Sequence, residues 1–132
     1  MRKLRDFLIM AEDVLIGVVG PCAAGKSTLI AGLRLRGYKI RHIAQEHSYV
    51  KDMWKRITNP DILIYLDVSY PTSCVRRNMD WTEKEYEQEI FRLRDARAHA
   101  NYYLNTDGLS IEEVFNRVYT YLANVTSPKA PS

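Results

Sequence analysis

Residues 20–27, Gly-Pro-Cys-Ala-Ala-Gly-Lys-Ser, have the types and spacing of a loop that binds phosphate, G-x-x-x-x-G-K-[ST]. Glycines at both ends let the backbone curl so that successive N–H groups point inward at an anion, and a helix that begins near Gly25 adds its positive dipole. We expect Lys26 to reach the β- and γ-phosphates of a nucleotide and the Ser27 hydroxyl to bind Mg²⁺. The residues predicted to bind the nucleotide here are Gly20, Pro21, Cys22, Ala23, Ala24, Gly25, Lys26, Ser27 and Thr28.

The surroundings of this motif also fit phosphate binding. An apolar strand precedes it at residues 14–19, and Leu29, Ile30 and Leu33 follow it at helical spacing. The alternative is a chance match in a turn rich in glycine and alanine. We disfavour it because a lysine at a helix N-terminus is electrostatically unfavourable unless an anion lies there.

A second polar segment, residues 45–48, ends the next expected strand. Open α/β sheets bind ligands beyond the C-terminal ends of their strands. We therefore interpret Glu46 as a candidate catalytic carboxylate and His47 as a group that orients an acceptor or takes a proton near neutral pH. The alternative is an ordinary polar loop in which Ser48 caps a short helix.

The remaining chain alternates between strand and helix patterns. A nearly continuous apolar run at 61–68 is typical of a parallel strand buried on both faces. Two capping boxes, Thr82 with Glu85 and Ser110 with Glu113, begin helices. Strands are expected at 14–19, 38–45, 61–68 and 102–105, and helices at 25–36, 48–57 and 71–78, from 82, and from 110. This order predicts an α/β protein with three α/β/α layers and a short parallel sheet of about four strands.

Length and composition define the general class of protein. With 132 residues and 46% hydrophobic residues, the chain forms one domain at 14–125, with a leader or short helix at 1–13 and a flexible tail at 126–132. A net charge of +3 does not favour nucleic acid as the main partner, and no stretch approaches the length of a membrane span. Cys22 and Cys74 suggest neither a disulfide framework nor a zinc site, so we expect a reducing, cytoplasmic setting.

Several segments together resemble the P-loop (Walker A) nucleotide and small-molecule kinases, such as the adenylate, thymidylate, dephospho-coenzyme A and adenylyl-sulfate kinases. The resemblance covers most of residues 14–125 and is carried by the phosphate loop, the strand at 61–68, the arginine pair after it, the arginine-rich helix and the loop at 105–108. It implies a P-loop NTPase fold with ATP and Mg²⁺ as cofactors. Only residues 28–60 separate the loop from the strand at 61–68, which indicates a compact form with a reduced acceptor-binding region.

The resemblance also implies roles for individual residues. Arg76 or Arg77 would stack on adenine, and a lid arginine, Arg92, Arg94 or Arg97, would close over the phosphates; the alternative for such arginines is a solvated helix face. The loop residues Asn105, Asp107 and Gly108 would lie against the base edge. Asp67 is a candidate for supporting Mg²⁺ together with Ser27, although by its neighbours it resembles the strand that leads to the lid.

These observations predict a Mg²⁺-dependent transfer of a phosphoryl group from ATP to a small molecule or nucleotide. The alternative is a nucleotide-binding module without transfer, acting as a sensor or partner subunit, for which Trp54 and Trp81 would supply either a partner surface or core packing. A GTPase is disfavoured because its D-x-x-G and N-K-x-D motifs are absent from the sequence. A homodimer stays open, since a chain this short leaves room for a second copy to supply pocket walls.

Overall fold

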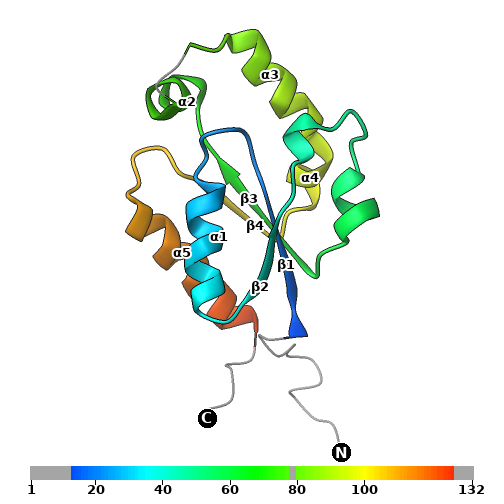
Figure 1. Ribbon diagram of the computed structural model, residues 1–132, viewed down its shortest axis with the longest axis vertical. Helices are drawn as coiled ribbons and strands as arrows, with labels where there is room; N and C mark the ends of the chain where they lie inside the picture. Colours follow the sequence, from blue (N-terminus) through cyan, green and yellow to red (C-terminus); the bar gives the residue numbers. More distant parts are fainter. Residues whose placement is uncertain (1–12, 78–79, 127–132) are drawn as a thin grey trace, which may run out of the picture.

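The computed structural model describes residues 13–77 and 80–126, which form a four-stranded, all-parallel sheet flanked by helices (Figure 1). The strands are β1 (Leu15–Val19), β2 (Lys39–His42), β3 (Ile62–Asp67) and β4 (Tyr102–Asn105), and their order across the sheet is β2-β1-β3-β4. The α/β class and the sheet of four parallel strands are confirmed.

The register places the C-terminal ends of β1 and β2 side by side, next to the C-terminal half of β3. Val18 of β1 lies opposite His42 of β2, and Val19 lies opposite Tyr65 of β3. Because the strands are parallel, the phosphate loop after β1, the polar segment after β2 and the residues after β3 all emerge at one edge of the sheet.

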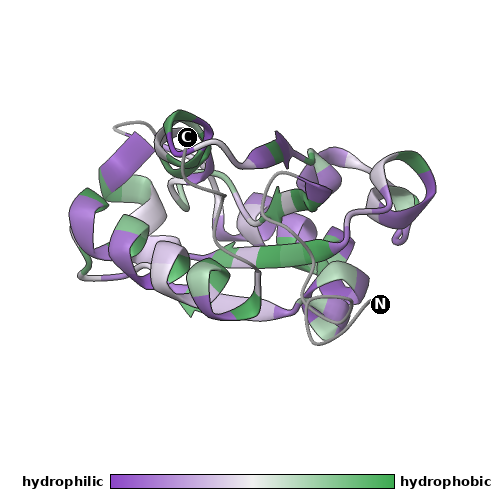
Figure 2. Ribbon diagram, turned by 90° about the horizontal axis from the view of Figure 1, so that it is seen from below, coloured by the Kyte–Doolittle hydropathy of each residue, from purple (hydrophilic) through white to green (hydrophobic). Residues whose placement is uncertain are grey.

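The helices cover both faces of the sheet. On one face α1 (Lys26–Leu35) and α5 (Ile111–Val125) pack over a core that includes Leu33, Val118 and Leu122. On the other face α3 (Glu83–Arg92) and α4 (Arg94–His99) cover a smaller core. Figure 2 shows a hydrophobic strand running between helices that mix hydrophobic and hydrophilic turns.

Both capping boxes are present. Thr82 accepts the Glu85 N–H and Ser110 accepts the Glu113 N–H, while each glutamate accepts the N–H of its cap residue. The ring of Trp81 lies edge-on to that of Tyr86, 5.9 Å between centroids, as expected for a hydrophobic staple. The short segment α2 (Tyr70–Arg77) follows β3 as predicted.

Three local expectations are wrong. The second strand ends at His42 rather than at residue 45, and a 3₁₀ turn η3 (Gln45–His47) follows it. Ser48 does not cap a helix: the helical turn there, η4 (Trp54–Thr58), has Met53 at its N-cap, because the Gln45 side chain accepts the Trp54 N–H and holds the start of the turn there. The expected helix from Thr82 is interrupted at Leu93, which is buried at the junction of α3 and α4.

The expected leader at 1–13 and tail at 126–132 lie outside the described residues, apart from Asp13 and Thr126. Trp54 and Trp81 are each 7% exposed, so both indole rings pack in the interior rather than on a partner surface. Within residues 13–77 and 80–126, no helix combines the length and apolar character that crossing a bilayer requires.

Candidate functional site

The phosphate loop leaves β1 and enters α1 through three residues in left-handed or related backbone conformations. Gly20 has φ 153°, Ala23 φ 71° and Gly25 φ 97°, and the Ala24 N–H donates to the Pro21 carbonyl. A Cβ at Gly20 would lie 2.0 Å from the carbonyl oxygen of Leu66 on β3, so only glycine fits there. The motif residues therefore form a tight turn anchored between β1 and β3.

Lys26 lies inside this turn. Its side chain is 7% exposed, and its Nζ donates to the carbonyls of Gly20 and Pro21 and to Glu46 Oε2 at 2.9 Å. The salt bridge crosses from the first residue of α1 to the 3₁₀ turn after β2. The structure thus brings together the two residues that the sequence analysis selected as the phosphate lysine and the catalytic carboxylate.

Two histidine side chains lie near the Glu46 carboxylate. The Nε2 atoms of His42 and His47 each lie 3.9 Å from Glu46 Oε2, and both histidine side chains are exposed. Partial burial and then the charge of Lys26 lower the pKa of His42 below its ordinary value. The second oxygen of the buried Glu46 carboxylate, Oε1, has no hydrogen-bond partner in the part of the chain that the structure describes.

Arg92, at the end of α3, also reaches this site. Its Nη1 donates to the Glu46 carbonyl at 3.3 Å, and its guanidinium lies 4.7 Å from the ring centroid of Tyr49. Arg92, one of the three arginines that the family resemblance suggests for the lid, therefore contacts the segment that carries Glu46. Gln45 supports the same corner, because its side-chain amide donates to the carbonyls of Arg92 and Val50.

Glu89 of α3 contacts the phosphate loop directly. Its Oε1 accepts the Cys22 N–H at 2.9 Å and its Oε2 accepts the Cys22 thiol at 3.0 Å, and the residue is only 5% exposed. Burial and then the hydrogen bond to Glu89 raise the pKa of the Cys22 thiol to about 11. A carboxylate thus binds an N–H group of the loop that the motif assigns to phosphate.

Arg76 and Thr106 connect the phosphate loop to the loop after β4. The Arg76 guanidinium donates to the Ala23 carbonyl at 3.0 Å and to both the hydroxyl and the carbonyl of Thr106. The Thr106 hydroxyl lies 3.2 Å from the Ala24 carbonyl and 2.9 Å from that of Asp67. Thr106 is 1% exposed, whereas Arg76 is exposed, so the connection runs from the interior to the surface.

The other predicted residues of that loop hold its shape. Asn105 Oδ1 accepts the Asp107 N–H, Asp107 Oδ1 accepts the Ser69 N–H, and Gly108 has φ 72°. Desolvation, which raises the pKa of Asp107, is outweighed by hydrogen bonds from Ser69 and Thr72 and by the charge of Arg76, so the pKa of Asp107 is lowered.

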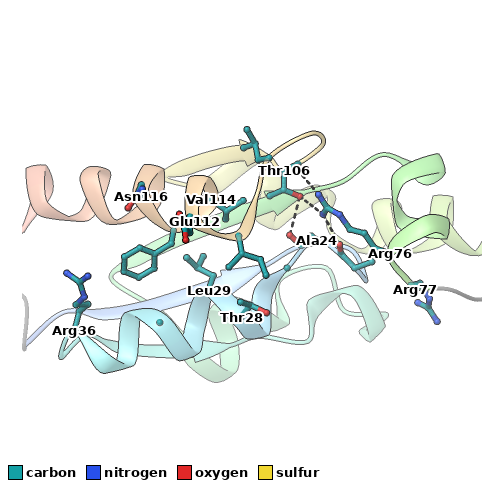
Figure 3. A pocket seen from close by; sticks show the side chains of 16 residues that line it. Ala24, Thr28, Leu29, Arg36, Arg76, Arg77, Thr106, Glu112, Val114 and Asn116 are labelled. Carbon is teal, nitrogen blue, oxygen red and sulfur yellow. Dashed lines mark hydrogen bonds between the residues drawn. The ribbon is translucent and has the colours of Figure 1, made fainter.

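A cavity of about 910 Å³ opens beside this connection (Figure 3). It begins at the phosphate loop, continues between α1 and α5, and is large enough for a nucleoside. Figure 3 shows Arg76 hydrogen-bonded to Thr106 at one end and Arg36 at the other. The loop, α1 and α2 contribute Ala23, Ala24, Gly25, Thr28, Leu29, Gly32, Arg36, Arg76 and Arg77, and the C-terminal segment contributes Thr106, Leu109, Ile111, Glu112, Val114, Phe115 and Asn116.

Arg77 and Asp67, for which the sequence predicted roles in nucleotide and metal binding, contact other protein groups. The guanidinium of Arg77 lies 4.5 Å from the ring centroid of Trp81, although Arg77 also lines the cavity. Asp67 accepts hydrogen bonds from the Tyr103 hydroxyl and from the N–H of Val68. Ser27 lies exposed in the first turn of α1.

Sequence reasoning missed three residues of this site, His42, Glu89 and Thr106. A signal for Glu89 was present, because it lies at helical spacing with Tyr86 and Leu93 on an otherwise apolar stripe. A charged residue on such a stripe needs a partner inside the protein. Nothing local marked Thr106, whose partners come from distant segments, whereas His42 lies only four residues before Glu46.

Comparisons with known proteins leave the family of this chain open. A scan of the sequence against models of protein families gives no match, and a search among curated proteins gives none either. What the structure shows is an α/β protein with a parallel sheet in the order 2-1-3-4, whose phosphate-loop motif, buried Lys26–Glu46 pair and adjoining cavity meet at one edge.

Proposed function

We propose that this chain is a P-loop kinase-like protein that binds ATP with Mg²⁺ and transfers the γ-phosphoryl group to a small molecule or nucleotide. The observation that carries the proposal is the buried Lys26–Glu46 pair inside the phosphate loop, with Glu46 Oε1 unpartnered among the described residues. A buried carboxylate with one oxygen available is a candidate base or metal-support group, and such a group has to lie beside the transferred phosphate.

The binding roles follow from the positions of the side chains. The N–H groups of residues 20–28 and Lys26 would hold the phosphates, and the cavity beside Arg76 would hold the nucleoside. Arginine binds phosphate oxygens through paired hydrogen bonds and also stacks on flat rings, so both Arg76 and Arg92 suit this ligand. We assign Mg²⁺ to the Ser27 hydroxyl, with Asp67 or Glu46 supporting it through water.

The reaction would form one bond and break one. An acceptor oxygen bonds to the γ-phosphorus, the bond from that phosphorus to the β–γ bridging oxygen breaks, and ADP leaves. The acceptor proton passes to Glu46 or to one of the neighbouring histidines. Phosphoryl transfer depends mainly on positioning and charge neutralisation, which a compact site supplies through Lys26, Arg92 and the metal.

Binding is tested first, by calorimetric titration of Mg·ATP into the full chain. Lys26→Ala removes a charged hydrogen-bond donor, so we expect affinity to fall about 10- to 100-fold. Lys39→Ala, an exposed lysine on β2, is the matched control and should bind like the parent protein. Equal affinity in the Lys26→Ala variant would refute the assignment of the phosphate site.

Transfer is tested by an acceptor screen with γ-labelled ATP. Glu46→Gln should retain nucleotide binding and lower the transfer rate by about 10²- to 10⁴-fold, the contribution typical of a catalytic base. Glu87→Gln, an exposed residue of α3, is the control for charge removal. Transfer that survives unchanged in Glu46→Gln would remove Glu46 from the mechanism.

The second candidate function is nucleotide binding without transfer. It is favoured by the short connection from β2 to β3, where residues 43–61 form only η3 and η4 and no separate acceptor-binding domain. It predicts tight Mg·ATP binding that depends on Lys26, with no labelled product from any small-molecule acceptor. The two assays above therefore distinguish the two functions.

A further inference from the structure

Three side chains at the rim of the phosphate loop have the chemistry of a metal site. The Sγ of Cys22 and one ligand atom from each of His47 and Glu89 all lie within 4.8 Å of one another. The three come from separate elements: the loop after β1, the turn η3 and the helix α3. Among residues 13–77 and 80–126, this is the one group of three or more such side chains found close enough to share an ion.

The geometry needs little adjustment to hold an ion. Tetrahedral Zn²⁺ with bonds of about 2.3 Å to sulfur and about 2.0–2.2 Å to nitrogen or oxygen keeps its ligand atoms roughly 3.3–3.6 Å apart. Cys22 Sγ and Glu89 Oε2 are 3.0 Å apart, in a hydrogen bond whose proton a metal would replace. The imidazole of His47 is 61% exposed and therefore has room to move the remaining distance.

Charge gives an independent reason to expect a cation here. Glu89 is only 5% exposed, and within the described residues it accepts hydrogen bonds from a backbone N–H and a thiol, both neutral. Within the described part of the chain, none of the ion pairs involves Glu89, and Lys26 pairs with Glu46 instead. A buried carboxylate is costly without an opposite charge. A divalent cation would balance Glu89 together with a Cys22 thiolate.

The donor set also selects the class of metal. A thiolate with an imidazole and a carboxylate suits a borderline-soft ion such as Zn²⁺, whereas Mg²⁺ prefers oxygen ligands alone. Three protein ligands leave one tetrahedral position open for water or another ligand. We propose that Cys22, His47 and Glu89 bind a thiophilic divalent cation of the Zn²⁺ class, and that this cation and a nucleoside triphosphate weaken each other's binding.

The second part of this proposal rests on the proposed function. Glu89 Oε1 accepts the Cys22 N–H, one of the loop donors available to a phosphate. A cation on Glu89 and Cys22 fastens the carboxylate to the loop and keeps that donor occupied. By linkage, each ligand then lowers the affinity of the other by the same factor.

Co²⁺ is the probe for the metal site, because a cysteine ligand gives Co²⁺ a thiolate charge-transfer band. The reduced, metal-stripped full chain is titrated with Co²⁺ and then with Zn²⁺ as competitor. Cys22→Ser, which keeps the loop N–H, should lose the band, and His47→Gln and Glu89→Gln should each weaken binding by at least about tenfold. The matched controls Cys74→Ser, His99→Gln and Glu87→Gln should behave like the parent chain. Circular dichroism shows whether each variant is folded.

No thiolate band in the parent chain, or a band that survives in folded Cys22→Ser, would overturn the metal site. Protection of Cys22 from alkylation by Zn²⁺, read by mass spectrometry of the peptide, is a second readout and should be absent in Glu89→Gln. Unprotected Cys22 at saturating Zn²⁺ would likewise overturn it.

The coupling is measured by titrating Mg·ATP with and without Zn²⁺. Because ATP itself chelates Zn²⁺, the same pair of titrations is run on Cys22→Ser, and only the parent-specific loss of affinity counts. If Zn²⁺ lowers the Mg·ATP affinity of the parent chain and of Cys22→Ser by the same factor, the proposed mutual weakening is refuted. A chain that shows the Co²⁺ band but binds no ATP under any condition would refute the proposed function and leave the metal site standing.

Discussion

At the scale of single residues, hydrogen-bonding groups of the candidate site already have partners within the protein. The Glu89 carboxylate accepts one loop N–H, and Lys26 donates to Glu46 and to two loop carbonyls. A triphosphate carries the same sign of charge as Glu89 and would use the same donors. Binding therefore requires Glu89 to leave Cys22, and the strength of that contact subtracts from the affinity for the ligand.

Replacing Glu89 should accordingly favour the nucleotide. Glu89→Gln removes the negative charge and weakens the competing hydrogen bond, so we expect Mg·ATP to bind about tenfold more tightly. The measurement is calorimetric titration in buffer stripped of thiophilic metals. Glu87→Gln on the same helix is the control. Weaker binding in Glu89→Gln would mean that the carboxylate assists the nucleotide rather than competing with it.

At the scale of elements, the two glycines of the phosphate loop have different tasks. Gly20 lies against the backbone of β3, where a Cβ would approach the Leu66 oxygen to 2.0 Å. Gly25 has φ 97°, but a Cβ there meets nothing within 4 Å. One glycine therefore permits the packing of β1 on β3, and the other permits the turn into α1.

These tasks are separable by substitution. Gly20→Ala should lose more than about 3 kcal/mol of stability or fail to fold, because neither backbone is able to yield. Gly25→Ala should fold with a loss of about 1–2 kcal/mol from the left-handed strain and should bind Mg·ATP much more weakly. Urea denaturation and calorimetry measure the two quantities. A Gly20→Ala protein as stable as the parent would contradict the strand contact.

The capping box of α5 gives a pH-dependent test at the same scale. Hydrogen bonds from the backbone and then the side chain of Ser110 lower the pKa of Glu113 below its ordinary value of 4.5. A lowered folded-state pKa adds stability above the unfolded pKa, and this stability is lost as pH falls through the folded value. Glu113→Gln should therefore melt at a lower temperature than the parent chain at pH 7, and the difference should shrink below about pH 4.

The neighbouring Glu112→Gln keeps the box intact and serves as the control in those thermal melts. If the difference in melting temperature between Glu113→Gln and the parent chain stays constant from pH 7 to pH 3, the ionised box does not stabilise α5.

Elements with local signals were the predictable ones. The glycine spacing of the phosphate loop, the boxes at Thr82 and Ser110, and the apolar run of β3 each depend on residues close in sequence. Three features that do not depend on residues close in sequence were not predicted. These are the end of β2 at His42, the start of η4 away from Ser48, and the interruption of the helix at Leu93. Gln45, which binds the start of η4 and the end of α3, fixes part of this geometry through contacts 5 to 47 residues away.

The same reasoning explains which residues of the candidate site were predictable from the sequence. Lys26 and Glu46 were predictable because parallel strands bring their C-terminal ends to one edge. The apolar stripe of α3 marked Glu89 as a residue that needs a partner, but the identity of that partner depends on how α3 docks over the loop, which no short sequence pattern encodes. The ribbon in Figure 1 makes this visible: α3 lies far along the chain from the loop that follows β1.

At the scale of the whole molecule, the sheet separates two cores of unequal size. The larger one lies under α1 and α5, and the smaller one joins Val19, Tyr65 and Leu93 beneath α3 and α4. Only the smaller core holds the helix that carries Glu89. Damage to either core should therefore cost stability, but only damage to the smaller one should loosen the contact between Glu89 and the phosphate loop.

A pair of matched substitutions tests this division. Leu93 and Leu122 are both fully buried, one in each core, and truncation of either to alanine should cost about 2–5 kcal/mol in urea denaturation. Leu93→Ala loosens α3 and with it the hold of Glu89 on Cys22, so at a temperature where both variants are folded it should raise Mg·ATP affinity toward that of Glu89→Gln. Leu122→Ala should leave the affinity unchanged, because Leu122 lies in α5 beyond Asn116, the last residue that lines the proposed nucleoside cavity, and does not contribute to the core beside α3. Equal effects of the two substitutions on nucleotide affinity would show that the cores are coupled through the sheet, and that the position of α3 alone does not set access to the loop.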